Sequence, residues 1–291
     1  MRKREIEQKD LIEIVNQLRL FVNQKTSARK ASASLKGVSQ GVISHLLSGN
    51  WEPYSDDMFR KIGAQLGFNS KEWQFADTTN STDILENLAD AKQNSLVLSF
   101  IGHAGAGKSA TTKKFASENK NVFRIECGQY WDRNYFLSEI LSQMGVKDVE
   151  PKISYMMRDI VSGLKKLDKP QLIIDEVDKL DDKVLLFLIT FYNELATHCS
   201  IIILATHFLK KRIDDGIRLR KKGYEEIKSR YGSYIELEDT SAKDVKLICE
   251  ANGLDDNRSI NTISANSRGD LRKVYNAVIA SRIDEKRKIT A

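Results

Sequence analysis

Cysteine is scarce in this sequence, and long apolar runs and internal repeats are absent from it. The three cysteines stand far apart with no C-x-x-C pair, so neither a disulfide framework nor a zinc site is indicated. No apolar run approaches the ~20 residues of a membrane span, and the charged residues after Met1 lack the apolar core of a signal peptide. These absences predict a soluble protein of the cytoplasm.

The charge is uneven along the chain. Over 291 residues, 41% of them hydrophobic, the formal net charge is +6, and at roughly 100–200 residues per domain this length allows two or three domains. Three islands carry the excess: residues 1–75 hold 12 Lys or Arg against 8 Asp or Glu, residues 209–230 hold 9 against 4, and residues 268–288 hold 7 against 3. Basic islands on an otherwise acidic chain indicate a polyanionic partner, and we expect nucleic acid.

Residues 1–76 are predicted to form an all-helical domain. Helical apolar spacing covers residues 11–22, and residues 31–49 read as a short helix, a turn at Gly37 and a second helix capped by Ser39. A further helix is expected over 56–66.

The segment 31–49 resembles the helix-turn-helix of phage repressors. Ala33, Val38 and Ile43 would be buried, and the second helix would enter a DNA major groove. The side chains offered to the groove would be Gln40, Ser44 and His45. Any small bundle of short helices gives a similar pattern, so a protein-binding role for this domain stays open.

From residue 83 onward the pattern is that of an α/β domain. The polar, aperiodic residues 77–82 predict a linker, with Ser81 or Thr82 as the cap of the following helix. Short apolar runs then alternate with amphipathic helices, which predicts a parallel sheet covered on both faces. The expected strands span 96–101, 122–127, 171–174, 200–205 and 233–237. Residues 239–291 have only helical patterns and form the predicted lid of a core over 83–238.

Residues 102–109 fit the phosphate-loop pattern G-x-x-x-x-G-K-[ST] without a mismatch. An apolar strand leads in and a helix follows, so backbone N–H groups and the helix dipole would favour phosphate. Lys108 would reach the β- and γ-phosphates of ATP, and Ser109 would hold Mg²⁺. The expected nucleotide contacts are Gly102, His103, Ala104, Gly105, Ala106, Gly107, Lys108, Ser109 and Ala110.

The acids Asp175 and Glu176 follow the apolar run 172–174, about 65 residues after the loop. Ligands bind at the carboxyl ends of strands in open α/β sheets. Asp175 would orient the Mg²⁺, and Glu176 would polarise the attacking water. Asp178 is expected to be a helix cap or an interface residue.

This pair of acids, with the loop, resembles the AAA+ ATPases, a P-loop fold with a helical lid. The resemblance implies a polar residue after the next strand that orients the water, and Thr206 stands there, with His207 as the alternative. It also implies an arginine before the fifth strand that reaches a neighbouring subunit's γ-phosphate, for which Arg230 is the candidate. In the lid, Arg272 would contact the γ-phosphate, and Arg268 is the fallback.

A helix-turn-helix joined to one AAA+ module is similar to the MuB-like family of phage and transposon target-DNA-binding ATPases. That resemblance is specific at the nucleotide motifs and loose elsewhere. It implies an ATP-dependent homo-oligomer, as a filament or ring, that binds duplex DNA with little sequence choice and delivers it to a transposase. Phosphate contacts by Lys and Arg give such affinity without sequence choice.

Two further functions remain open on the sequence. One is a helicase-loader or replication-initiator ATPase of the DnaC and IstB type, and the other is a transcription regulator switched by ATP. Besides the repressor-like helix, the candidate DNA contacts follow the second and fourth strands: Arg133, Lys210, Lys211, Arg212, Arg218, Arg220, Lys221 and Lys222.

Overall fold

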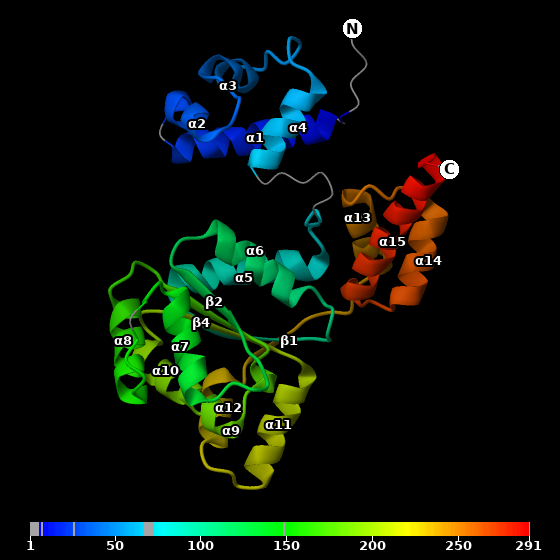
Figure 1. Cartoon of the computed structure of the whole chain (residues 1–291). Helices are drawn as coiled ribbons and strands as arrows, with labels where there is room; N and C mark the ends of the chain where they lie inside the picture. The colour runs from blue at the N-terminus through cyan, green and yellow to red at the C-terminus, as the bar shows by residue number, and fades with distance from the viewer. Residues whose placement is uncertain (1–5, 7, 26, 67–72, 148, 291) are drawn as a thin grey trace. The chain divides into compact units, whose positions relative to one another are not determined.

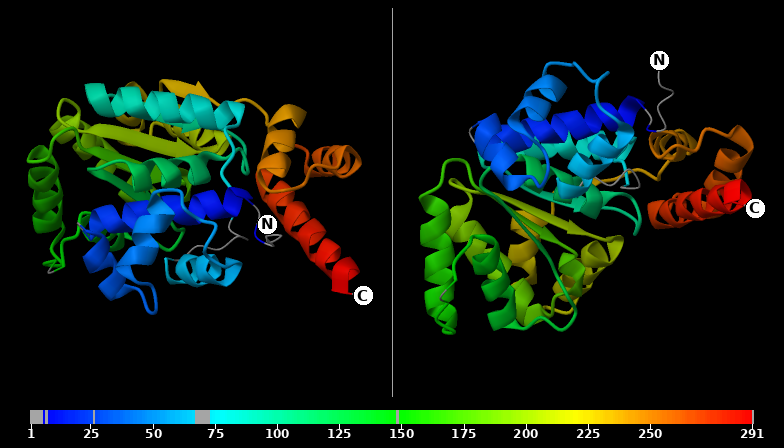
Figure 2. Two further views of the ribbon diagram at one scale, coloured as in Figure 1. Left: turned by 90° about the horizontal axis from the view of Figure 1, so that it is seen from above. Right: turned by 45° about the horizontal axis from the view of Figure 1, so that its top comes forward.

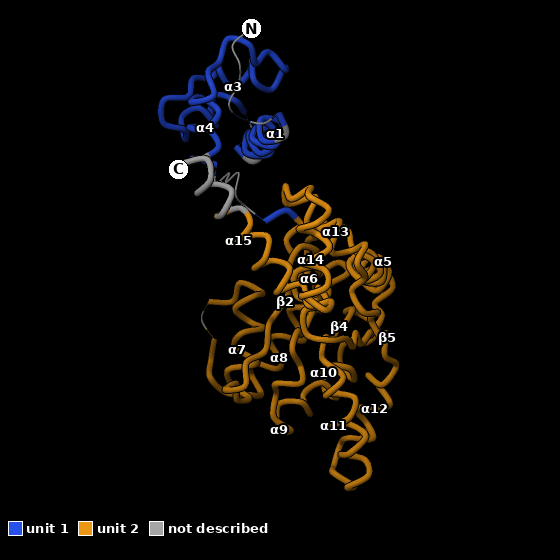
Figure 3. Tube along the Cα trace, turned by 90° about the vertical axis from the view of Figure 1, so that its right-hand side faces the viewer, with its two compact units in different colours: residues 1–74 blue, residues 75–291 orange. Residues whose placement is uncertain are grey.

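The computed structural model describes residues 6, 8–25, 27–66, 73–147 and 149–290, without the side chains of Lys9, Gln24, Ala64, Arg282 and 284–290. The chain divides into two compact units, residues 1–74 and 75–291 (Figure 3). None of the helices in the described residues is long and apolar enough to cross a bilayer.

The first unit is a small helical bundle, as the sequence predicts. Its helices are α1 (Gln8–Gln24), α2 (Ala28–Ser34), α3 (Gln40–Leu47) and α4 (Asp56–Gln65). The Ser39 hydroxyl caps α3 by accepting from the backbone N–H of Val42 at 3.3 Å. Val38 and Ile43 are buried as expected, but Ala33 is exposed because Ala31 and Leu35 fill the core instead.

The second unit is built on a five-stranded parallel sheet in the order β2-β3-β4-β1-β5 (Figure 1). The strands are β1 (Val97–Ile101), β2 (Val122–Glu126), β3 (Gln171–Asp175), β4 (Ser200–Ala205) and β5 (Tyr234–Glu236). All five coincide with predicted runs. Strands β3 and β4 are buried along their whole length, which explains the continuous apolar runs 172–174 and 201–205 within them.

Helices cover both faces of this sheet (Figure 2). On one face α5 (Thr79–Asn94) and α6 (Lys108–Glu118) share a core with Phe100, Ile173 and Ile202. On the other face the alternate strand residues, among them Ile174 and Ile203, contact the larger core. Its helices are α7 (Arg133–Gln143), α8 (Ile153–Lys165), α9 (Asp182–Leu185), α10 (Phe187–Leu195), α11 (His207–Arg218) and α12 (Tyr224–Tyr231), with the short helix η1 (Val177–Lys179) after β3.

The chain ends in a lid of three helices within the described residues: α13 (Ala242–Ala251), α14 (Asn257–Ser267) and α15 (Leu271–Thr290). The fold class is therefore the predicted one: a parallel α/β sheet with a phosphate-loop motif after β1 and a helical lid, in a chain that begins with an all-helical unit.

The prediction that residues 77–82 form a linker is wrong. Helix α5 already begins at Thr79, and its cap is Thr78, whose hydroxyl accepts from the N–H of Ser81 at 3.2 Å. The backbone N–H and hydroxyl of Thr79 both donate to the Asp244 carboxylate, at 2.8 and 3.1 Å. Because Asp244 belongs to the lid, the local sequence could not show that Thr79 is paired with it or that Thr78, Asn80 and Ser81 are buried.

Candidate nucleotide-binding site

The phosphate-loop motif forms the turn between β1 and α6. Gly105 and Gly107 have φ angles of 84° and 89°, which glycine adopts without strain. A Cβ atom on Gly105 would lie 2.1 Å from Oδ1 of Asp270 in the lid. The glycine is thus required both by its backbone and by the lid residue against it.

Lys108 is the first residue of α6 and lies inside this loop. Its ammonium donates to the carbonyl oxygens of Gly102 at 2.7 Å and His103 at 2.9 Å, and the residue is 9% exposed. Burial lowers the pKa of Lys108, and the nearby carboxylates of Asp175 and Asp178 act against that shift. Ser109 follows in the first turn of α6, where unpaired backbone N–H groups favour an anion.

Asp175 is the last residue of β3 and is 1% exposed. Its Oδ1 accepts from the N–H of Glu176 at 2.9 Å, and its Oδ2 accepts from the guanidinium of Arg124 at 2.6 Å. Sequence reasoning missed Arg124, although a charged residue between the apolar Phe123 and Ile125 of a strand was a signal.

Glu176 stands at the turn after β3 with a left-handed φ of 56°, a conformation that costs energy in a residue other than glycine. Its carboxylate forms an ion pair with Lys179, and the Glu176 side chain is 25% exposed. The strained turn thus places a partly exposed carboxylate just beyond the C-terminal end of β3, and the phosphate loop follows the same end of β1.

Thr206 follows β4, the strand between β1 and β3 in the sheet. Its hydroxyl donates to Asp178 Oδ2 at 2.8 Å, and the same oxygen caps α11. The alternative, His207, packs its ring against the ring of His103 in the loop, with centroids 4.7 Å apart. Both residues therefore lie at the site, and only Thr206 is bonded to the acidic turn.

Arg230 lies on α12, just before β5, and does not join its own site. Strand β5 runs parallel to β1 with Tyr234 beside Ser99, so Arg230 precedes its strand whereas the phosphate loop follows the end of β1. Its guanidinium donates to Asn193 Oδ1 at 3.1 Å and to the carbonyl oxygen of Glu226 at 3.2 Å, and it covers the ring of Tyr192.

Arg272 lies in the first turn of α15, and this turn is bonded to the phosphate loop. The N–H of Leu271 donates to the carbonyl oxygen of Gly105 at 3.0 Å, and the positive charge of Arg272 is one of the influences that lower the pKa of Lys108. Arg268, the fallback, is exposed and ends α14 with a φ of 50°.

The candidate DNA contacts differ in their availability. Gln40, Ser44 and His45 lie on the exposed side of α3, where the His45 ring is bonded to the Tyr54 hydroxyl at 2.8 Å. Arg133 is exposed at the start of α7.

After β4, most cations already have acidic partners. Lys210 pairs with Glu236, Arg218 with Asp215, and Lys221 with Asp182. Arg212 is the least exposed of these paired cations, with 15% of its side chain exposed, and its guanidinium is bound to the Leu180 carbonyl and the Asp182 carboxylate, both at 2.6 Å. The remaining candidates are exposed, namely Lys211, Arg220 and Lys222.

A family model matches the part of the chain that holds most of this site. Residues 75–213, slightly less than half of the chain, match the family model described as an AAA domain. The matched segment contains the phosphate loop, Asp175, Glu176 and Thr206, and it ends before Arg230 and the lid. No curated protein matches the chain.

Solved structures resemble the chain distantly. Thermotoga maritima RuvB, solved as a mutant, is 19% identical with a TM-score of 0.49, and the match covers 75% of this chain and 65% of that one. The Drosophila ORC bound to DNA is 14% identical with a TM-score of 0.48, covering 72% of this chain and 55% of that one. The chain thus spans less than two thirds of the length of either.

Proposed function

We propose that this protein binds ATP at the phosphate loop and hydrolyses it. One observation carries the proposal. The loop that buries Lys108 follows β1, Asp175 and Glu176 stand at the end of β3, and Thr206 follows β4, the strand between them, so all lie at the C-terminal ends of parallel strands. Loop and helix dipole supply phosphate binding, and the acids supply what transfer to water requires.

The residues present fit Mg²⁺ as the cofactor, since a hydroxyl in the first turn of α6 and a buried carboxylate face the same loop. Ser109 and Asp175 would hold the ion, which supplies charge neutralisation on the phosphates. Lys108 would exchange its loop carbonyls for phosphate oxygens, a stronger, charge-assisted bond. Glu176 would leave Lys179 to take the proton of the attacking water, and Thr206 would orient that water through Asp178.

We further propose that hydrolysis requires a second copy of the chain. Arg230 precedes β5, whereas the phosphate loop follows the end of the parallel strand β1, and its guanidinium is bonded to Asn193 and Glu226. Its proposed target is therefore the γ-phosphate of a neighbouring subunit in a homo-oligomer. An arginine supplied in this way stabilises charge on the transferring phosphoryl group. Arg272 would contact the γ-phosphate from the lid of the same subunit.

The partner we propose is duplex DNA, with the oligomer acting as a MuB-like target-delivery factor for a transposase. The exposed Lys211, Arg220 and Lys222 and the polar face of α3 support an anionic partner. With ATP, the protein should form assemblies on duplex DNA that negative-stain microscopy detects. Preference for single strands would favour the helicase-loader alternative, and one tight palindromic site with negligible turnover would favour the regulator.

The nucleotide site is tested by the variant Lys108→Ala. We expect it to lose ATP binding measured by titration calorimetry, because its ammonium supplies the charge-assisted bond to phosphate inside the loop. Lys113→Ala is the matched control, since this exposed lysine lies on the same helix beyond the loop. Unchanged binding by Lys108→Ala would refute the site.

A further inference from the structure

Arg124 is a charged residue in the middle of the edge strand β2, and its side chain is only 12% exposed. Edge strands often carry charges that point to water. Here the guanidinium instead turns inward, over the end of β3 and the start of α6. Burying an arginine is costly unless it is fully paired, so its partners are informative.

The guanidinium joins the two halves of the candidate metal site. Its Nη2 donates to Asp175 Oδ2 at 2.6 Å, and its Nε donates to the Thr112 hydroxyl at 3.0 Å. Nη2 also reaches Glu126 at 3.1 Å, on the solvent side. The flat, rigid fork of arginine serves these directions at once, whereas the ammonium of a lysine is a single point charge.

Thr112 extends this connection to the phosphate loop. It is fully buried, and its hydroxyl lies 3.0 Å from the carbonyl oxygen of Lys108 and 3.3 Å from that of Ser109. A hydroxyl accepts and donates together, so Thr112 receives the Arg124 bond and passes one to the first turn of α6. The sequence of contacts therefore runs from Asp175 through Arg124 and Thr112 to the turn that carries Ser109.

We propose that Arg124 is a positioning residue that fixes the Asp175 carboxylate relative to the Ser109 turn, and so sets the affinity of the site for Mg²⁺-nucleotide. The inference rests on the proposed function, because Ser109 and Asp175 are the groups proposed to hold the ion. Hydrogen-bonded partners of metal-binding groups commonly set metal affinity by 10–100-fold.

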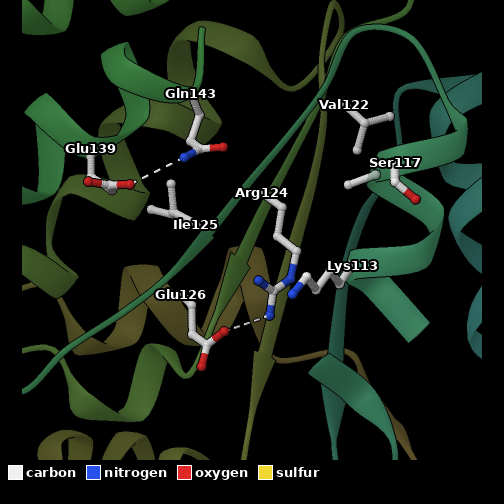
Figure 4. Close-up of a pocket in the computed structure, with 9 residues that line it drawn as sticks. Lys113, Ser117, Val122, Arg124, Ile125, Glu126, Glu139 and Gln143 are labelled. Atoms are coloured by element: carbon white, nitrogen blue, oxygen red, sulfur yellow. Dashed lines mark hydrogen bonds and ion pairs between the residues drawn. The ribbon is translucent and has the colours of Figure 1, made fainter. Parts of the chain in front are cut away.

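The surroundings of Arg124 supply a matched control. An open hollow of about 450 Å³ lies beside it, lined from α6, β2 and α7 (Figure 4). Glu126 stands at this hollow with 54% of its side chain exposed. Glu126→Gln removes one charge beside Arg124 but leaves its bonds to Asp175 and Thr112 in place.

The experiment measures the affinity of a fluorescent ADP analogue with Mg²⁺ and again with EDTA, in the full chain. For Arg124→Ala and Thr112→Val we expect the ratio of the two affinities to fall by ~10–100-fold, with the EDTA value unchanged within about twofold. Arg124→Lys should have a ratio between those of Arg124→Ala and the wild type, and Glu126→Gln should have the wild-type ratio. Thr112→Val and Arg124→Lys decide the question if Arg124→Ala does not fold, which a thermal melt shows.

Two results separate the inference from the proposed function. A wild-type ratio in Thr112→Val and Arg124→Lys would overturn the positioning role, and a raised ratio would show that Arg124 competes with the cation. If the wild-type protein does not bind the analogue at all, or binds it equally well after Lys108→Ala, the proposed function fails instead.

Discussion

At the scale of single residues, the site depends on a few groups held in unusual states. Lys108 is bonded to loop carbonyls, Asp175 is buried against Arg124, and Glu176 sits in a left-handed turn. A glutamate accepts this strained backbone at a cost of about 1–3 kcal/mol, which its role beside the phosphate loop would explain.

Glu176→Gln tests the proposed base. We expect this variant to bind ATP as the wild type does, since the loop is untouched, while hydrolysis falls by ~10²–10⁴-fold. Phosphate release and nucleotide binding are measured on the same preparation. Glu225→Gln on the exposed start of α12 is the control, and normal turnover by Glu176→Gln would remove Glu176 from the mechanism.

Gly105→Ala tests the contact between loop and lid. An alanine there would meet Asp270 at 2.1 Å and would need a φ of 84°. We expect ATP binding to be lost and the melting temperature to drop, because Ala at a positive φ is destabilising. Gly253→Ala shares the positive φ but has open space around it, so it separates strain from collision. Wild-type ATP binding by Gly105→Ala would show that the contact between the loop and Asp270 is not needed for the nucleotide site.

At the scale of elements, a group of contacts around Asp182 holds α9 against α11 and α12. Its carboxylate accepts from Tyr224 at 2.5 Å, Arg212 at 2.6 Å and Lys221 at 3.1 Å. The Tyr224 hydrogen bond, with those from Arg212 and Lys221, holds the pKa of Asp182 well below its ordinary value of 3.8. This network uses two cations that the sequence suggested for DNA.

The stability of this network should depend on pH. Because the folded pKa of Asp182 is depressed, its stabilisation is complete above the unfolded value near 3.8 and is lost as the pH falls further. Asp182→Asn should therefore melt earlier than the wild type at pH 7, and the difference should shrink below about pH 4. Thermal melts from pH 7 to pH 3 check this, and a constant difference would contradict it.

The elements were largely predictable, whereas their contacts were not. Apolar runs identified all five strands, since buried strands need continuous apolar side chains. The start of α5 was missed because Thr79 is stabilised by Asp244, 165 residues away in the sequence. Arg124 and Asp270 were missed for the same reason: Arg124 is bonded to residues of α6 and β3, and Asp270 lies against Gly105 of the phosphate loop.

At the scale of the whole molecule, duplex DNA binding should depend on the exposed cations after β4. Changing Lys211, Arg220 and Lys222 to Ala should weaken DNA affinity for every sequence tested. The slope of log affinity against log salt concentration should also become less steep by about 0.9 for each phosphate contact removed. Fluorescence anisotropy over a salt series measures both, with Lys228→Ala, paired with Asp214, as the control. An unchanged slope would exclude these residues from the DNA surface.

If a neighbouring subunit completes the ATP site, a mixture of two inactive variants should recover activity. Glu176→Gln lacks the base but keeps Arg230, and Arg230→Ala lacks the arginine but keeps Glu176. We expect each variant alone to bind ATP with little phosphate release, and their mixture to release phosphate at a substantial fraction of the wild-type rate. Wild-type turnover by Arg230→Ala alone, or a mixture as inactive as its parts, would contradict this expectation.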